Sequence, residues 1–201
     1  ANGDAQSCRM ELGLDPAVST LLVTGASQGA TSINVLMTSL ARTNPQLFEH
    51  WQILHLTGSG ADEEVRKAYA SAGIRAVVQP FVHEVGKAWG AADLAISRAG
   101  ANSVAEAVHN RVPCLFLPYP HHKDMHQLHN AKPIADAGGA IIVMDQVNPE
   151  RNRASLEPAL AELLSSPHSI SEMRVNLERV AAPDAALHVA GLLLTSLTRM
   201  S

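Results

Sequence analysis

The chain has 201 residues and a mass of 21.3 kDa, enough for one substantial hydrophobic core. Its 15 basic and 19 acidic residues give a formal net charge of −4, which argues against a basic surface for nucleic acid or anionic lipid. No apolar run approaches the roughly 18 residues that a membrane span needs. Cys114 lies in an apolar run far from Cys8, so we expect reduced thiols and a cytoplasmic location.

The amino-terminal residues 1–18 are predicted to approach the folded domain as a linker. The chain begins at Ala1 rather than at a methionine, and residues 1–7 are small and polar without a signal-peptide pattern. An Asp15-Pro16 break closes the segment. We therefore expect this sequence to be a piece of a longer protein.

The middle of the chain alternates between apolar runs and helical patterns. Buried strands are predicted at 20–24, 51–56, 76–81, 93–97, 113–117 and 140–144. Helices are predicted between them, at 62–72, 84–89, from 101, at 124–137, and around the helically spaced Ile33, Leu36, Met37 and Leu40. This alternation predicts an α/β fold over residues 19–147, a doubly wound, Rossmann-like parallel sheet flanked by helices.

The carboxyl-terminal part, residues 148–201, has a helical pattern throughout. Pro167 and Pro183 divide it into about three helices, which we expect to pack on the same domain.

Two glycine turns follow predicted strands, where parallel sheets usually bind ligands. The first, Gly25-Ala26-Ser27-Gln28-Gly29-Ala30, lacks the G-x-G-x-x-G spacing of a dinucleotide fingerprint, and no acidic residue ends the next strand. An alternative interpretation is that its glycines bind no ligand and only allow a tight turn and close helix packing. A second turn at Gly100 favours a ligand, because two turns on neighbouring central strands would face one crevice.

The second turn lies in Ile96-Ser97-Arg98-Ala99-Gly100-Ala101-Asn102-Ser103-Val104-Ala105-Glu106, where a strand passes through a turn into a helix. A helix start leaves backbone N–H groups unpaired and suits a phosphate or pyrophosphate. Glu106 lies about one turn further, where a carboxylate could accept hydrogen bonds from a ribose diol. Arg98 could be structural, pairing near the sheet edge, or could contact phosphate.

A polar cluster rich in histidine extends from Pro118 to Asn130. His122, His126 and His129 share one helical face and could bind a metal, but no carboxylate or cysteine follows at ligand spacing. We favour a polar loop and helix start in which His126 and Gln127 hydrogen-bond sugar hydroxyls. No nucleophile motif is present, since a G-x-S-x-G elbow is absent.

Taken together, four motifs resemble the carboxyl-terminal domain of the MurG family over roughly Leu12 to Leu164. They are the first glycine turn, the pair Phe81-Val82, the stretch 97–106 and the cluster 118–130. The resemblance implies one half of a GT-B glycosyltransferase, the half that holds the sugar nucleotide. The chain departs from the family at Ala26, where a glycine is usual, and at His126, where many members have glutamine.

The resemblance also implies a role for each motif. Ser27 would contact the diphosphate, Val82 would meet the uracil edge through its backbone, and N–H groups of residues 101–103 would bind the diphosphate. Glu106 would hold the ribose hydroxyls, and His126 with Gln127 would hold the sugar hydroxyls. The implied UDP-N-acetylglucosamine site comprises Ser27, Gln28, Val82, Gly100, Ala101, Asn102, Ser103, Val104, Ala105, Glu106, His126 and Gln127.

As an activity, the resemblance implies transfer of N-acetylglucosamine from UDP-N-acetylglucosamine to undecaprenyl-pyrophosphoryl-MurNAc-pentapeptide (lipid I) in peptidoglycan synthesis, with inversion. No cofactor and no metal would be required. Any general base and the site for the lipid-linked acceptor would lie in an amino-terminal domain of the same protein, on the cytoplasmic face of the inner membrane. We expect this chain to contain no catalytic residue and to be inactive alone.

Three alternatives remain open from the sequence. One is a related GT-B transferase with another UDP-sugar or lipid acceptor, such as a diacylglycerol glycosyltransferase. Another is a UDP-N-acetylglucosamine epimerase of the same shape. The third is a nucleotide-binding module without catalysis.

Overall fold

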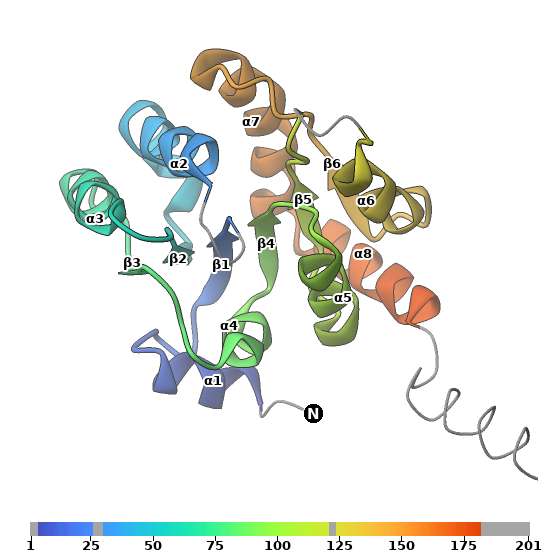
Figure 1. Ribbon diagram of the computed structural model, residues 1–201. Coiled ribbons are helices and arrows are strands. Elements are labelled where there is room, and N and C mark those ends of the chain that lie inside the picture. Colours follow the sequence, from blue (N-terminus) through green and yellow to red (C-terminus); the bar gives the residue numbers. More distant parts are fainter. Residues whose placement is uncertain (1–3, 26–29, 121–123, 182–201) are drawn as a thin grey trace, which may run out of the picture.

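The computed structural model describes residues 4–25, 30–120 and 124–181, which fold as parallel strands between two layers of helices (Figure 1). The six-stranded sheet has the order β3-β2-β1-β4-β5-β6, with every neighbouring pair parallel. Its strands are β1 (Ser19–Thr24), β2 (Trp51–Leu56), β3 (Ala76–Gln79), β4 (Leu94–Ser97), β5 (Cys114–Phe116) and β6 (Ala140–Ile142). The predicted doubly wound α/β fold is confirmed.

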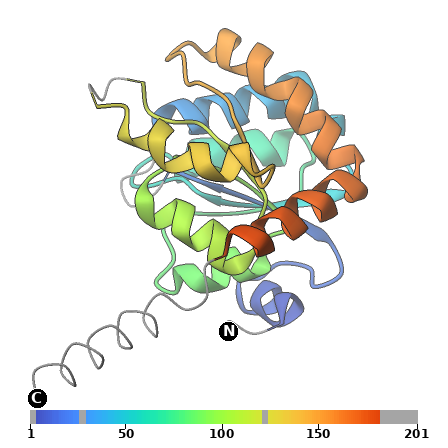
Figure 2. The same ribbon diagram turned by 90° about the vertical axis from the view of Figure 1, so that its right-hand side faces the viewer.

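The helices cover both faces of the sheet (Figures 1 and 2). Helix α7 packs on α2, and α8 lies beside α5. The helices are α1 (Ala5–Glu11), α2 (Thr31–Thr43), α3 (Asp62–Ser71), α4 (Val85–Ala91), α5 (Ala101–Asn110), α6 (His126–Asp136), α7 (Pro149–Ser165) and α8 (Pro167–Val180), with a 3-10 turn η1 (Pro45–Phe48). None of the described helices is long and apolar enough to span a membrane.

The ends of several elements differ from the prediction. The third strand stops at Gln79 rather than residue 81, because Pro80 has no N–H to donate to a neighbouring strand. The fifth and sixth strands are also shorter than predicted, at three residues each. The break at Pro167 separates α7 from α8 as predicted, whereas the helix expected after Pro183 lies outside the described residues.

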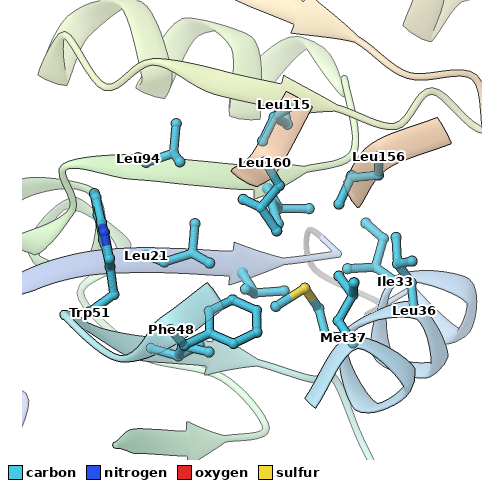
Figure 3. Packing of buried hydrophobic residues seen from close by; sticks show 14 of the residues in the cluster. Leu21, Ile33, Leu36, Met37, Phe48, Trp51, Leu94, Leu115, Leu156 and Leu160 are labelled. Atoms are coloured by element: carbon cyan, nitrogen blue, oxygen red, sulfur yellow. The ribbon is translucent and has the colours of Figure 1, made fainter. Parts of the chain in front are cut away.

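Two hydrophobic cores lie on the two faces of the sheet. Alternate residues of β1 point to opposite faces, so Leu21 joins one core and Leu22 the other. In the first core, strand residues meet Met37 of α2 and Leu160 of α7 (Figure 3). The second core lies under α1, α4, α5 and α6 and contains Trp89.

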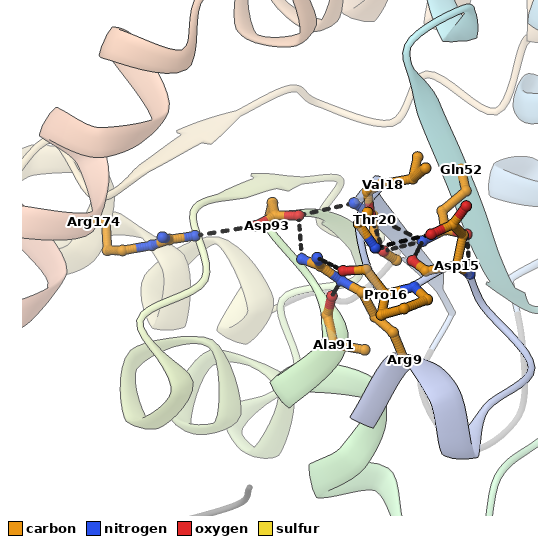
Figure 4. A network of polar contacts seen from close by, with 10 residues as sticks. Arg9, Asp15, Pro16, Val18, Thr20, Gln52, Ala91, Asp93 and Arg174 are labelled. Atoms are coloured by element: carbon orange, nitrogen blue, oxygen red, sulfur yellow. Dashed lines mark hydrogen bonds and ion pairs between the residues drawn. The ribbon is translucent and has the colours of Figure 1, made fainter. Parts of the chain in front are cut away.

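The amino-terminal segment is tied to the sheet by buried polar contacts (Figure 4). The Arg9 guanidinium donates to the carbonyl oxygens of Ala91 (3.0 Å) and Pro16 (3.0 Å) and pairs with Asp93 at 2.7 Å. Gln52 of β2 accepts from the Asp15 N–H at 2.9 Å. Residues 4–18 are thus held against the domain, although the division at residues 18 and 147 stays a prediction.

A buried polar chain crosses from α2 through β2 to α3. His55 of β2 is fully buried, with its Nδ1 2.9 Å from the Tyr69 hydroxyl and its Nε2 3.0 Å from Asn34 Oδ1. Asn34 donates its amide to the Thr57 carbonyl at 2.9 Å. The amide oxygen therefore accepts from His55 Nε2–H, and His55 Nδ1 accepts from Tyr69, so the imidazole is neutral. Burial lowers the pKa of His55 from 6.5 to about 3.

The neutral burial of His55 predicts acid sensitivity of folding. Between pH 6.5 and about pH 3 the unfolded chain binds a proton at His55 that the folded chain does not. The free energy of unfolding should therefore fall with decreasing pH in this window, by up to about 1.4 kcal/mol per pH unit from this group. Urea unfolding of the wild type and of His55→Asn, at several pH values, measures the difference between their slopes.

His168→Asn is the matched control, because the His168 side chain is 83% exposed. This variant should keep the pH dependence of the wild type, whereas His55→Asn should lose the part due to the buried imidazole. Parallel curves for the wild type and His55→Asn would contradict the neutral burial of His55.

Candidate functional site

The order of the strands reverses between β1 and β4, and the candidate site lies at that point. The chain runs from β1 outward to β3 and then returns to β4 on the other side of β1, with Thr24 opposite Ser97 at the carboxyl ends. The helices that follow β1 and β4 diverge there, which leaves a crevice.

A cavity of about 420 Å³ opens on the α4 and α5 side of these strand ends. Its floor is apolar, and its polar groups come mainly from the first turns of α5. The lining residues are Leu22, Thr24, Leu56, Pro80, Phe81, Val82, Val85, Trp89, Asn102, Ser103 and Glu106. The structure thus brings together the predicted residues Val82, Asn102, Ser103 and Glu106.

Helix α5 begins at this cavity with an open amino end. Gly100 precedes the first helical residue, and no side chain among the described residues caps the helix. The first intrahelical bond runs from the Val104 N–H to the Gly100 carbonyl at 3.0 Å, so the N–H groups of residues 101–103 have no partner within the helix. A Cβ at Gly100 would meet nothing within 4 Å among the described atoms. This open helix start can accept an anion.

Glu106 lies one turn further along α5 and is partly buried. Its Oε2 accepts a hydrogen bond of 2.8 Å from Nε1 of Trp89 on α4. Burial raises the pKa of the Glu106 carboxyl above its ordinary value, and the bond from Trp89 opposes that rise. A carboxylate has room for several donors, so Glu106 can accept further hydrogen bonds from a ligand in the cavity.

The loop after β3 forms the rim of the cavity. Val82 is partly buried and packs against the second core, whereas Phe81 is 62% exposed. The rings of Phe81 and His83 meet edge to face, with centroids 5.3 Å apart. The rim therefore combines an apolar wall with backbone groups of residues 80–84. Three further predicted residues lie on α5 but do not line the cavity. Ala101 and Ala105 are exposed, and Val104 is partly buried.

Ser27 and Gln28 of the first glycine turn lie outside the described residues, so their contacts stay predictions. The strand before the turn ends at Thr24, which lines the cavity, and α2 begins at Thr31.

The Arg98 guanidinium is engaged in contacts within the fold, which favours its structural role over a contact with phosphate. Its Nη1 donates to the Leu117 carbonyl at 2.7 Å, and its Nη2 lies 2.7 Å from both Ser32 Oγ and Asp145 Oδ2. The Asp145 side chain is completely buried. Burial alone would raise the pKa of Asp145, but hydrogen bonds, first that from Ser32, and the Arg98 charge hold it below its ordinary value. This pair joins the carboxyl ends of β4 and β6 to the start of α2.

His126 and Gln127 do not line the cavity beside Glu106. His126 Nδ1 lies 2.9 Å from Asp124 Oδ1, and Gln127 Oε1 accepts from the Tyr119 N–H at 2.9 Å. Asn130 of the same helix donates to the Ala99 carbonyl at 3.1 Å, which brings α6 beside the turn before α5. The assignment of His126 and Gln127 to a sugar therefore stays a prediction.

No group of three or more histidine, cysteine, aspartate or glutamate side chains that could hold a metal occurs in the described part of the chain. His122, one of the three histidines considered for such a site, lies outside that part.

Trp89 lines the cavity and bonds to Glu106, but the sequence patterns did not single it out. It stood at the end of a short predicted helix, without any assigned partner. A usable signal was present, because a buried indole N–H usually needs an acceptor and Glu106 follows on the next helix.

Residues 20–189 match the family model described as "Glycosyltransferase family 28 C-terminal domain". The chain belongs to this family. The same family membership is supported by a relative from Pseudomonas fluorescens strain Pf-5, 35% identical over 175 residues, which are 87% of this chain and 48% of that protein. Its name is UDP-N-acetylglucosamine–N-acetylmuramyl-(pentapeptide) pyrophosphoryl-undecaprenol N-acetylglucosamine transferase.

A relative of the same name from Protochlamydia amoebophila is 43% identical over 143 residues, covering 69% of this chain and 37% of that protein. Among solved structures, MurG of Acinetobacter baumannii is similar with a TM-score of 0.74 and 29% identity, over 97% of this chain and 56% of that one. WaaG, a lipopolysaccharide glycosyltransferase, shares the fold with a TM-score of 0.65 and 18% identity, over 90% of this chain and 47% of that one. The chain spans about half the length of the curated relatives it matches.

The structural role of Arg98 predicts a large loss of stability on its removal. Arg98→Met would leave the completely buried Asp145 carboxylate without its cation, which should lower the free energy of unfolding by about 3 kcal/mol or more. Urea unfolding followed by circular dichroism measures this change.

Two further variants make the Arg98 test specific. Adding Asp145→Asn to Arg98→Met should recover part of the loss, because the stranded charge is gone. Arg42→Met should change the unfolding free energy by less than about 0.5 kcal/mol, because the Arg42–Glu64 pair is exposed and 3.9 Å long. An Arg98→Met chain as stable as the wild type would mean that Arg98 has no such role.

Proposed function

We propose that this chain is the donor-binding half of an N-acetylglucosaminyltransferase and that it binds UDP-N-acetylglucosamine in the crevice at the carboxyl ends of β1 and β4. The observation that carries the proposal is one juxtaposition. A partly buried carboxylate, Glu106, and the open amino end of α5 face the same cavity of about 420 Å³. Family membership and the names of the relatives agree with it.

The proposed pose follows the chemistry of each part of the site. Uracil would lie against the apolar wall, with its edge at the backbone of Val82. The ribose hydroxyls would donate to Glu106, and the diphosphate would accept from the N–H groups of residues 101–103. Ser27 and Gln28 would reach the diphosphate from the first glycine turn. His126 and Gln127, near the start of α6, would bind the sugar.

In this proposal the chain aids transfer through the leaving group. Negative charge builds on the UDP diphosphate as the bond to the sugar breaks, and fixed N–H groups at a helix start stabilise that charge in the transition state. The acceptor proposed from the relatives' names is the N-acetylmuramyl-pentapeptide linked to pyrophosphoryl-undecaprenol. Because this acceptor carries a lipid, the transfer would take place at a membrane surface. The general base and the acceptor site would come from a second domain, so transfer would need more than this chain.

The ribose contact makes the proposal testable by calorimetric titration with UDP, UDP-N-acetylglucosamine and UDP-galactose. The chain should bind all three, with a preference for UDP-N-acetylglucosamine. Glu106→Ala should weaken each affinity by on the order of 1–3 kcal/mol, because it removes a partly buried acceptor of the ribose hydroxyls.

Glu162→Ala is the control, since Glu162 is an exposed carboxylate on α7, and its affinities should equal those of the wild type. A preference for UDP-galactose would indicate a transferase for another UDP-sugar. Absence of binding to all three nucleotides would refute the proposed site.

A further inference from the structure

Trp89 makes the one hydrogen bond to the Glu106 carboxylate that comes from a described residue, at 2.8 Å from its Nε1 to Oε2. We propose that Trp89 is a positioning residue, which fixes this carboxylate in the orientation that receives the ribose hydroxyls. This inference rests on the proposed function. It assigns a role in nucleotide binding to a residue that would otherwise be only part of the hydrophobic core.

The direction of this hydrogen bond is set by the packing of the indole. Trp89 is 1% exposed, and it belongs to the second core together with Leu22 and Ala95. A ring enclosed in this way cannot rotate, so Nε1–H points along one line. The bond engages Oε2 and leaves Oε1 for other donors.

Helix α4, which carries Trp89, is itself held in place. The Ala91 carbonyl at its carboxyl end accepts from Arg9 Nε at 3.0 Å, and Lys87 pairs with Glu11 of α1 at 2.6 Å. Contacts also join α4 to α5, the helix of Glu106. The donor and the acceptor are therefore carried by two helices that are fixed to each other.

This arrangement matters for affinity because a free glutamate side chain loses conformational freedom when a ligand binds it. A hydrogen bond made before binding has already restricted the side chain, so less entropy is lost in the complex. The Trp89 bond should therefore strengthen the binding of ligands that use Glu106 and leave unaffected those that do not.

The test compares UDP with 2′,3′-dideoxyuridine diphosphate, which lacks both ribose hydroxyls, by calorimetry on the 201-residue chain. Trp89→Phe removes the N–H donor and keeps an aromatic ring. This substitution should weaken the affinity for UDP about tenfold, and it should leave the affinity for the dideoxy analogue within about twofold of the wild-type value. In a Glu106→Ala background, Trp89→Phe should have no further effect on UDP.

Trp51→Phe is the matched control. Trp51 is the other tryptophan, is also buried, and donates its Nε1–H to the Leu164 carbonyl at 3.0 Å in the core on the opposite face. Its loss should lower stability without changing either affinity. Equal weakening of UDP and the dideoxy analogue by Trp89→Phe would show that the indole only shapes the cavity, and unchanged UDP binding would likewise overturn the inference.

A second measurement does not depend on the folding of Trp89→Phe. In the Trp51→Phe chain all tryptophan emission comes from Trp89. Saturating UDP should shift this emission, because the indole N–H and the ribose share one carboxylate, and the dideoxy analogue should shift it less. Bound UDP without any shift would overturn the inference.

The outcomes separate this inference from the proposed function. Wild-type binding that is lost in Glu106→Ala but kept in Trp89→Phe refutes only the role of Trp89. Absence of UDP binding to the wild type refutes both.

Discussion

The parallel sheet is covered by helices on both faces, so its backbone polar groups are accessible only along its two edge strands and where its strands end. This constraint places the chemistry of the molecule. Strand interiors hold apolar side chains such as Leu21, Leu22 and Ile96, all of them fully buried. Groups that can meet a ligand are concentrated beyond the carboxyl ends of β1 and β4, where the helices diverge and the cavity opens.

The two ends of the sheet differ in how their polar groups are used. At the amino ends, Arg9 pairs with Asp93, and Gln52 donates to the carbonyl oxygens of Asp15 and Val18 (Figure 4). At the carboxyl ends, the Arg98–Asp145 pair closes part of the edge, while the start of α5 receives no cap from the side chains that the structure describes. Satisfied groups contribute rigidity, whereas the N–H groups at the start of α5 and the Glu106 carboxylate can form further hydrogen bonds.

Hydrophobic periodicity was enough to predict the six strands and the doubly wound fold, because buried parallel strands are continuous apolar runs. The position of Glu106 beside the cavity was predictable because it follows the Gly100 turn by about one turn of the same helix. The partners of Trp89 and Arg98 were harder to predict, because each bond joins two elements that only the packing of the fold brings together. Arg98, for example, meets Asp145 only after β6 is placed beside β5.

The contacts of Arg9 have a mechanical consequence. One guanidinium binds the end of α4, the start of β4 and the segment before β1, so α1 and α4 are joined as one rigid block. A force applied at the amino end of the chain would be carried to α4 as a rigid-body displacement rather than absorbed by a flexible hinge. Through the indole of Trp89, that displacement would reach the carboxylate of Glu106.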